Sequence, residues 1–424
     1  MGYKEVWRLF DIAIATATQS PHRERVRAPR PRSNVERWHV VFGERQRPLF
    51  LPHAPHAIQQ KCIRFFHSTA LKLLYARCLL RLRKVLPEVT LPHEGLWTLI
   101  ENILPPRLSE AIAYVAVYAG TPSPNQKASL LLISDRGELL AVVKLALRVT
   151  ADSLVDNEAD WLNRLASIPF IRERIPKLLA HGELASGRHY VVKTVSSGSA
   201  KEQGFTERHI RFLTALGRSS LVAAPYTESK GFRALLQSYA QVRPTLDEAA
   251  ARALSAALEA CSSRLAGWVG PLTLSHGEFS SWNICAQDDE LFVFDWEYAE
   301  EGANPLQDAL HYHLIRPAAR GRKISVQEFS SVMQRIEQFA MAAYPEWSWD
   351  ANIVTGLALV YLLRVVLYYA EVERALHMNR PVTRTYMFLL RNVIEHEPER
   401  REPALSMDNL SILPAHAAKT QGLE

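Results

Sequence analysis

The segment 276–297 constrains this chain of 424 residues more than any other part of it. It carries, in fixed order, a carboxylate at Glu278, an amide at Asn283 and a second carboxylate at Asp295. The second carboxylate follows the apolar run 291–294, which predicts a buried strand. The first two groups are expected on a loop, because the glycine and serine residues around them interrupt any regular pattern.

This order of side chains is suited to one kind of chemistry. A loop can aim the Glu278 carboxylate at a hydroxyl while Asn283 and the strand-end Asp295 hold a divalent cation. Phosphoryl transfer uses this combination, because its catalysis is mostly positioning together with charge neutralisation by metal. The pattern therefore predicts a base at Glu278 and Mg²⁺ ligands at Asn283 and Asp295.

The segment also resembles a known family. A His-Gly pair at 276–277, followed by Asn283 and by a strand that ends in Asp295, is similar to the catalytic loop and metal-binding Asp of aminoglycoside phosphotransferases and choline kinases. That family has a protein-kinase-like fold. Its usual first carboxylate is Asp, where this chain has Glu278. His276 is predicted to belong to the catalytic site together with Glu278, where we expect it to brace the loop through hydrogen bonds and not to transfer protons.

The region upstream fits the small lobe of such a fold. Alternating or apolar runs predict strands at 113–119, 130–134, 139–145, 175–182 and 190–195. The third strand carries Lys144, and an amphipathic helix that follows it carries Glu158. This order of elements matches the small lobe of the family. It runs from a strand through a turn-rich loop to a second strand, then a hairpin, a strand with Lys, a helix with Glu and two further strands. Together with the catalytic loop, the resemblance covers residues 111–310.

The resemblance also implies where a nucleotide would bind. Lys144, clamped by Glu158, would hold the α- and β-phosphates of ATP. Other expected nucleotide contacts come from the loop after the first strand and from the last strand of the lobe; they are Gly120, Lys127, Val192 and Thr194. Glu297 lies two residues after Asp295, so on an extended chain it would point the same way, toward the metal or the acceptor.

The expected fold class is therefore α+β: a small antiparallel β lobe and a larger helical lobe, preceded by a basic N-terminal region. The expected boundaries are 1–105 for the basic region with a long helix, 106–198 for the small nucleotide-binding lobe, 199–400 for the helical catalytic lobe and 401–424 for a loose tail. Helices are expected at 205–216, 246–268, 325–342, 353–376 and 384–394. Asp308 is expected to have a structural role.

Composition agrees with a globular enzyme of the cytoplasm. The chain is 48% hydrophobic and 22% charged, which is ordinary for a folded protein. Its four cysteines show neither metal-binding spacing nor a disulfide framework. The apolar stretch 353–370 is long enough for a membrane span, but Arg364 at its centre favours a buried helix of the large lobe.

The net charge of +6 is concentrated near the N-terminus. An arginine-rich run at 22–47 precedes a predicted basic amphipathic helix at 60–86. Residues 22–86 could contact an anionic membrane surface or a protein partner, which would make the protein peripheral to a membrane. The other interpretation is a helix packed on the lobes with a solvated basic face. Nucleic acid is not expected, because no binding motif with interleaved aromatic residues occurs.

The predicted function is ATP-dependent phosphorylation of a hydroxyl on a small molecule, such as a sugar, an amino alcohol or an aminoglycoside-like compound. The alternative is a nucleotide-binding pseudokinase with impaired catalysis and an interaction or membrane-surface role. Glu278 separates the two, because a misplacement of about 1 Å can cost on the order of 10²-fold in rate. Retention of Lys144, Glu158, Asn283 and Asp295 favours the enzyme.

Overall fold

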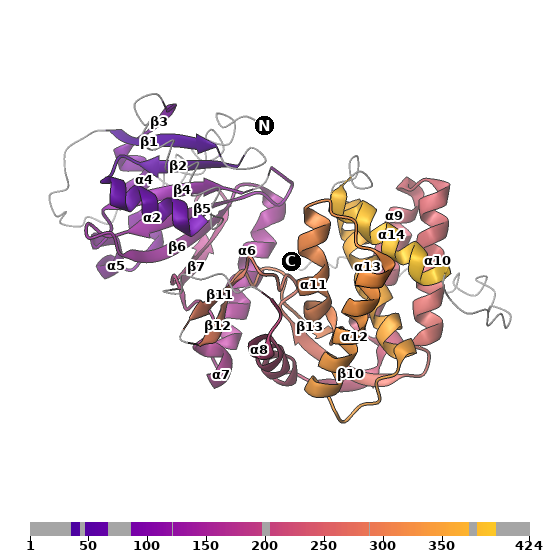
Figure 1. The fold of residues 1–424 in the computed structure, drawn as a ribbon. Coiled ribbons are helices and arrows are strands. Elements are labelled where there is room, and N and C mark those ends of the chain that lie inside the picture. Colours follow the sequence, from indigo (N-terminus) through magenta and orange to yellow (C-terminus); the bar gives the residue numbers. More distant parts are fainter. Residues whose placement is uncertain are drawn as a thin grey trace, which may run out of the picture.

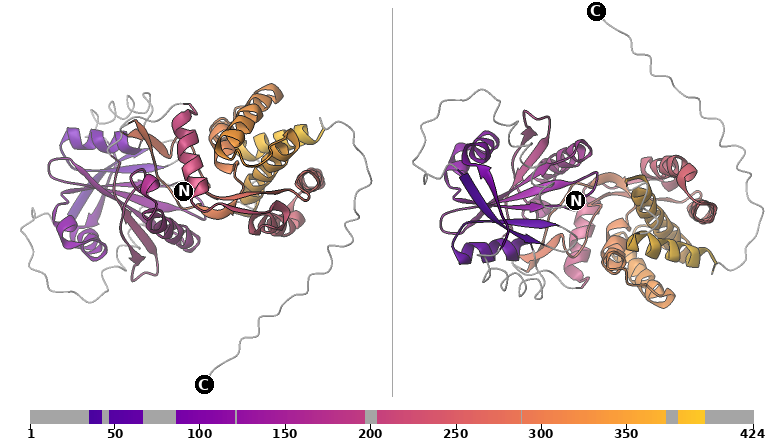
Figure 2. Two further views of the ribbon diagram at one scale, coloured as in Figure 1. Left: turned by 90° about the horizontal axis from the view of Figure 1, so that it is seen from below. Right: turned by 90° about the horizontal axis from the view of Figure 1, so that it is seen from above.

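The structure, a computed structural model, describes residues 35–42, 47–66, 86–120, 122–196, 204–287, 289–372 and 380–395. These residues form two lobes, one built on a sheet and the other mainly on helices (Figure 1). Views from above and below show the lobes at opposite ends of an elongated molecule (Figure 2). The expected two-lobed α+β fold of the kinase type is confirmed.

The small lobe is built on one eight-stranded antiparallel sheet in the order β3-β1-β2-β4-β5-β6-β8-β7. The five strands predicted from the sequence are present as β4 Tyr114–Ala119, β5 Lys127–Ile133, β6 Leu139–Ala146, β7 Leu178–Glu183 and β8 His189–Lys193. Their alternating side chains pack on both faces of the sheet. One face forms a core with helices α4 (His93–Ile103) and α5 (Pro106–Glu110).

The N-terminal region is part of this sheet. Its strands are β1 Val35–Phe42, β2 Pro48–Pro52 and β3 Glu88–Pro92. Strand β1 pairs with both β2 and β3, and β2 pairs with β4, so the sheet crosses the expected boundary at residue 105. The sequence indicated no strands here, because prolines and arginines obscure the alternation of buried residues such as Trp38, Val40, Leu49 and Leu51.

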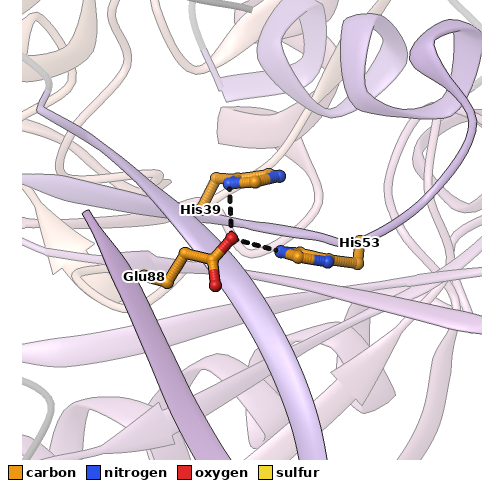
Figure 3. A group of neighbouring side chains, drawn as sticks. All are labelled: His39, His53 and Glu88. Atoms are coloured by element: carbon orange, nitrogen blue, oxygen red, sulfur yellow. Dashed lines mark hydrogen bonds and ion pairs between the residues drawn. The ribbon is translucent and has the colours of Figure 1, made fainter. Parts of the chain in front are cut away.

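A polar cluster links the three added strands (Figure 3). His53 Nε2 lies 3.0 Å from Glu88 Oε1, and His39 Nδ1 lies 3.5 Å from the same oxygen. The two imidazole rings are stacked, with centroids 4.2 Å apart. Because both rings face one carboxylate oxygen, the cluster joins β1 and β3 to the turn that follows β2.

The predicted long helix at 60–86 is described only over its first part. Helix α2, His56–Phe66, packs its buried residues Ile58, Cys62 and Ile63 on the opposite face of the sheet from α4. Most of the predicted arginine-rich run and the rest of the predicted helix lie outside the described residues.

Helix α6, Val149–Leu165, joins the sheet to the rest of the molecule. Its residues Ala151, Val155 and Ala159 pack on Val191 of the sheet, while Trp161, Leu162 and Leu165 belong to the core of the large lobe. The short helix α7, Pro169–Arg172, follows it. One helix thus spans the junction of both lobes and carries Glu158 there.

The large lobe is a bundle of helices with two small sheets. Its helices are α8 Glu207–Arg218, α9 Lys230–Val242, α10 Glu248–Arg264, α11 Gln307–Ala319, α12 Val326–Ala343, α13 Ala351–Val372 and α14 Pro381–Glu395, with short 3₁₀ turns at Tyr226–Glu228 and Arg243–Thr245. Strands β9 Val222–Pro225, β10 Val269–Ser275 and β13 Glu300–Ala303 pair in the order β13-β10-β9, and β11 Ile284–Gln287 pairs with β12 Glu290–Val293.

Helix α13 is the one described helix that is long and apolar enough to cross a membrane. Two thirds of its apolar window is buried within the protein. It packs against α9, α10 and α14, with Leu357, Leu362 and Leu363 fully buried. The helix is therefore a central core element of the large lobe, as the sequence indicated.

Candidate active site

The catalytic loop connects two strand pairs of the large lobe. It leaves β10 after Ser275 and enters β11 at Ile284, and the β11–β12 ribbon returns the chain to Asp295. The Phe294 N–H donates to the Asn283 carbonyl at 3.0 Å, which extends the ribbon by one pair. The local pairing therefore brings Asn283 close to Asp295, although twelve positions separate them in the sequence.

His276 is buried at the base of the loop. Its Nδ1 accepts a hydrogen bond from the Glu278 N–H at 3.2 Å, so Nε2 carries the proton and donates to the Phe294 carbonyl, also at 3.2 Å. Burial lowers the pKa of His276 to about 4. Both ring nitrogens are engaged with backbone, and His276 does not line the cavity. This geometry supports a bracing role for the imidazole and not a proton-transfer role.

Asp308, at the start of α11, holds the same loop from the other side. Its two carboxylate oxygens accept the backbone N–H groups of His276 at 2.7 Å and of Gly277 at 3.0 Å. Burial raises the pKa of Asp308 to about 6, against the opposing effect of these hydrogen bonds. The structural role expected for Asp308 agrees with this position.

Lys144 joins the two lobes at the centre of the site. Its Nζ lies 2.8 Å from Glu158 Oε2 and 3.0 Å from Glu297 Oε2, and it also contacts Asp295. Burial alone would lower the pKa of Lys144, but the three carboxylates raise it well above its usual value. The predicted Lys144–Glu158 pair is thus present, and it meets the strand-end carboxylate of the large lobe.

A second buried lysine shares Glu158. Lys193 on β8 forms an ion pair with Glu158 Oε1. Burial would raise the pKa of Glu158, but Lys144 and Lys193 together hold it below its usual value. Lys193 was not predicted from the sequence, which indicated its neighbour Val192 instead. Side chains alternate along a strand, so Val192 faces the core that includes Val143, and Lys193 faces the cavity.

The remaining expected nucleotide contacts line the cavity. Lys127 Nζ donates to Glu297 Oε1 at 2.8 Å, which brings the start of β5 to the catalytic centre. Gly120 approaches this strand so closely that a Cβ would lie 2.8 Å from the Lys127 carbonyl oxygen. Thr194 lies where β8 ends, and its Oγ1 accepts from the Lys177 N–H at 2.9 Å.

Glu278 also lines the cavity, on the side of the loop that faces the carboxylates. The amide Nδ2 of Asn283 donates to the Glu278 carbonyl at 3.1 Å and lies 3.4 Å from its Oε2. Burial, Asp295 and Glu297 raise the pKa of Glu278 to about 8. The loop therefore presents a carboxyl group with a high proton affinity to the cavity.

The residues fit a hard divalent cation such as Mg²⁺. Because Nδ2 of Asn283 is bonded to the loop, its amide oxygen is left for the cavity that Asp295 also lines. Oxygen atoms of Glu158, Asp295 and Glu297 lie within 4.8 Å of one another. Carboxylate and amide oxygens are the ligands that Mg²⁺ prefers. The two predicted metal ligands, Asn283 and Asp295, are thus brought together by the fold.

Helix α2 forms a wall of the same cavity, which the sequence did not indicate. Phe66 stacks on Tyr118 with ring centroids 4.9 Å apart. Tyr118 pairs across the sheet with Ser129, which pairs with Lys144, and these side chains line the cavity with Phe66. The N-terminal region therefore contributes directly to the side of the site that carries the expected phosphate-binding lysine.

Comparison with known proteins identifies the class. A model of the phosphotransferase enzyme family matches residues 129–322, from β5 to just beyond α11. The match confirms the resemblance to the family of aminoglycoside phosphotransferases and choline kinases over this part of the chain. No curated protein sequence matches the chain.

Solved structures of the same class are similar to the chain at low identity. Aminoglycoside phosphotransferase APH(4)-Ia has a TM-score of 0.49 and 14% identity, with 70% of this chain and 96% of that chain covered. The GDP complex of aminoglycoside 2'-phosphotransferase-IIIa has a TM-score of 0.44 and 16% identity, with 67% and 93% covered. Choline kinase from Cryptosporidium parvum Iowa II has a TM-score of 0.46 and 10% identity, with 71% and 94% covered.

Proposed function

We propose that the protein transfers the γ-phosphate of ATP to a hydroxyl group of a small molecule. The observation that carries this proposal is the position of Lys144, which contacts Glu158 of the small lobe and Asp295 and Glu297 of the large lobe at once. In a kinase-type site the lysine that holds the phosphates must face the carboxylate that holds the metal. The family match over residues 129–322 supports the same chemistry.

The nucleotide is assigned to the small-lobe side of the cavity. Lys144, oriented by Glu158, is placed to bind the α- and β-phosphates, and Lys127 adds a second cation beside it. Asn283 and Asp295 would hold Mg²⁺, which when bound neutralises charge on the transferred phosphate. Lys193 keeps Glu158 ionised and so helps to fix the orientation of Lys144.

The acceptor hydroxyl is assigned to the cavity beside Glu278. The Glu278 carboxylate takes the proton of the acceptor hydroxyl as the hydroxyl oxygen attacks the γ-phosphorus of ATP. The bond between the γ-phosphorus and the bridging oxygen of the β-phosphate breaks, and ADP leaves. The raised pKa gives the Glu278 carboxylate a higher proton affinity than an ordinary glutamate has, which favours transfer of the hydroxyl proton to it. The bonds from Asn283 and from the His276 ring to the Glu278 backbone fix the loop that aims this group.

Calorimetric titration with ATP tests the nucleotide part of the proposal. Wild-type protein should bind ATP more tightly with Mg²⁺ than without it. Asp295→Ala should lose this difference, because one anionic metal ligand is removed, while an exposed control such as Asp289→Ala should keep it. Equal affinities with and without Mg²⁺ in wild type would contradict the metal assignment, and failure to bind ATP at millimolar concentration would contradict the whole proposal.

A further inference from the structure

The cavity does not end at the catalytic loop. It continues as a groove between α11 and α13, two helices that lie side by side in the large lobe (Figure 1). On both helices the lining residues recur every four positions, so each helix turns one face to the groove. One such row is Gln307, His311, Ile315 and Ala319 on α11, and Tyr361, Val365 and Tyr369 on α13; a second row is Arg316 and Arg320 on α11 and Arg364 and Tyr368 on α13.

The far end of this groove is basic. Arg316 and Arg320 lie four residues apart on α11, and both line the groove. Arg380, the residue before α14, also lines this end. The start of α14 lies beside the end of α11, since a Cβ added at Gly321 would lie 3.5 Å from Cβ of Pro381. Arg316 and Arg320 are exposed and form no ion pair within the described part of the chain. They are therefore available to a ligand.

Acidic groups do not balance this end. The acidic residues among the cavity lining are Glu138, Glu278, Asp295, Glu297 and Glu300. Glu138 lies on the small lobe, and Glu278, Asp295 and Glu297 belong to the catalytic centre. Glu300 is the remaining carboxylate of the groove, and it is paired with Arg364 at 2.5 Å. A polycationic acceptor would thus meet Arg316 and Arg320, and no free carboxylate beyond the catalytic centre among the described residues of the lining.

The helix geometry sets the size of a ligand that reaches both ends. Asp308 at the start of α11 binds the catalytic loop, and Arg316 and Arg320 follow it by eight and twelve residues. At 1.5 Å of rise per residue these arginines lie roughly 12 and 18 Å along the helix from the loop. Between the two ends the walls include the apolar and aromatic side chains of Ile315, Val365 and Tyr369, and the charged Arg364 there is paired with Glu300.

From this arrangement we propose that the acceptor is an elongated anionic compound: a hydroxyl at one end for phosphorylation and a phosphate or carboxylate at the other for Arg316 and Arg320. Guanidinium groups match the planar geometry of carboxylates and the oxygen pairs of phosphates. The proposal rests on the function proposed above, since it names the class of acceptor for that site.

Binding of matched oligosaccharides tests the proposal without requiring turnover. The ligands are cellobiose and cellotriose, their terminal aldonic acids, their derivatives phosphorylated on the terminal sugar, and kanamycin as a polycation. Affinities are measured by calorimetry in low-salt buffer free of phosphate, on the full chain. The variants are Arg316→Ala/Arg320→Ala and the control Arg384→Ala/Arg391→Ala, which removes the same charge from exposed positions outside the cavity.

Wild type should bind an acid or a phosphate derivative roughly tenfold more tightly than its neutral parent, as expected for charge-assisted bonds to two arginines. The preference should disappear in Arg316→Ala/Arg320→Ala, persist in the control and return in part in Arg316→Lys/Arg320→Lys. The carboxylate and phosphate arms show which anion is preferred.

Three results would overturn the proposal: tighter binding of kanamycin or of a neutral sugar, no binding of any anionic member at 10 mM (on the order of 3 kcal/mol of binding free energy), or an anionic preference that survives removal of both arginines. The catalytic proposal fails separately. If anionic sugars bind through the arginines but no ADP forms with MgATP present, the groove assignment stands and the phosphotransferase assignment does not.

Discussion

At the residue scale, Gly277 of the catalytic loop and the predicted metal ligand Asp295 have positive backbone φ angles, +80° and +79°. Aspartate tolerates this region better than most residues, but glycine is the residue that adopts it freely. At Gly277 space is also limiting, because a Cβ would lie 2.2 Å from the Tyr298 carbonyl oxygen. The glycine next to His276 is therefore required by both the backbone and its surroundings.

Gly277→Ala should destabilise the protein and reduce turnover, because the loop must shift away from Tyr298. Gly267→Ala is a matched control: its φ is +70°, but nothing lies within 4 Å of a Cβ there. Gly267→Ala should lower the free energy of unfolding by about 1–2 kcal/mol, which is only the cost of placing an alanine in the left-handed region. Urea unfolding of both variants gives the comparison. Equal losses would mean that the close contact with Tyr298 is not limiting.

Glu278→Gln keeps the size of the side chain but cannot accept a proton, so kcat should fall by about 10²–10⁴-fold. Affinity for ATP should hold, because Glu278 is assigned to the acceptor side. Glu278→Asp distinguishes an adapted loop from an impaired one. If the loop is fitted to the longer side chain, kcat of Glu278→Asp should fall below that of wild type. If Glu278 is a replacement that weakens the site, kcat of Glu278→Asp should rise above that of wild type. A Glu278→Gln variant as fast as wild type would remove this residue from the mechanism.

At the element scale, the sequence predicted the parts whose patterns are local. Strands β4, β5, β6, β7 and β8 appear where alternation indicated them, and α6 brings Glu158 to Lys144. The parts that were missed depend on distant partners. Strand β10 was not predicted: it follows directly after the helix expected at 246–268, and its pairing with β9 and β13 is not visible in its own residues.

The candidate site was predictable to a similar degree. Glu278, Asn283 and Asp295 carry a motif with fixed spacing, so the sequence alone brought them together. Lys193 could have been found from the alternation along β8, which turns it to the same side as Val191 and away from Val192. The contributions of Phe66 and of Arg316 could not be found, because they depend on how α2 and α11 pack against other elements.

Helix α2 provides an element-scale test of the added N-terminal segment. Ile63→Ala should lower the free energy of unfolding by about 2–4 kcal/mol, because Ile63 is buried between α2 and the sheet. Phe65→Ala on the same helix removes a larger but exposed side chain and should cost much less. If both variants matched wild type in urea unfolding, α2 would not be an integral part of the small lobe.

At the scale of the whole molecule, ionised groups at the junction of the lobes couple the sheet to the bundle. Lys144, Glu158 and Lys193 come from the small lobe, and Asp295 and Glu297 come from the large lobe. Breaking one partner of such a buried network leaves an unpaired charge, which is strongly destabilising. The cytoplasmic location and the contact of residues 22–86 with an anionic surface or a partner stay predictions.

Buried histidines of the large lobe should make stability depend on pH. Burial lowers the pKa of His209 to about 4 and that of His311 to about 3, against an ordinary value of 6.5. Below pH 6.5 the unfolded chain binds protons that the folded protein does not, so the free energy of unfolding falls as pH is lowered. Each histidine should contribute a loss of about 2 kcal/mol by pH 5.

Urea unfolding at pH 7 and pH 5 checks this expectation. His209→Asn is the informative variant, because an amide oxygen can replace Nδ1 as acceptor for the Thr206 N–H. It should unfold with a smaller difference between the two pH values than wild type does. An unchanged difference would show that His209 is protonated in the folded state at pH 5.

The central claim is that the assembled site transfers phosphate to an alcohol. The most direct test is ³¹P NMR of wild-type protein with MgATP and the acceptor that binds best in the groove, beside Asp295→Ala as the inactive control, with the folding of the variant checked by circular dichroism. We expect a new phosphomonoester resonance that grows in equal amount with ADP and is absent for Asp295→Ala. ADP accompanied only by inorganic phosphate, or no change in a protein that binds both ligands, would contradict it.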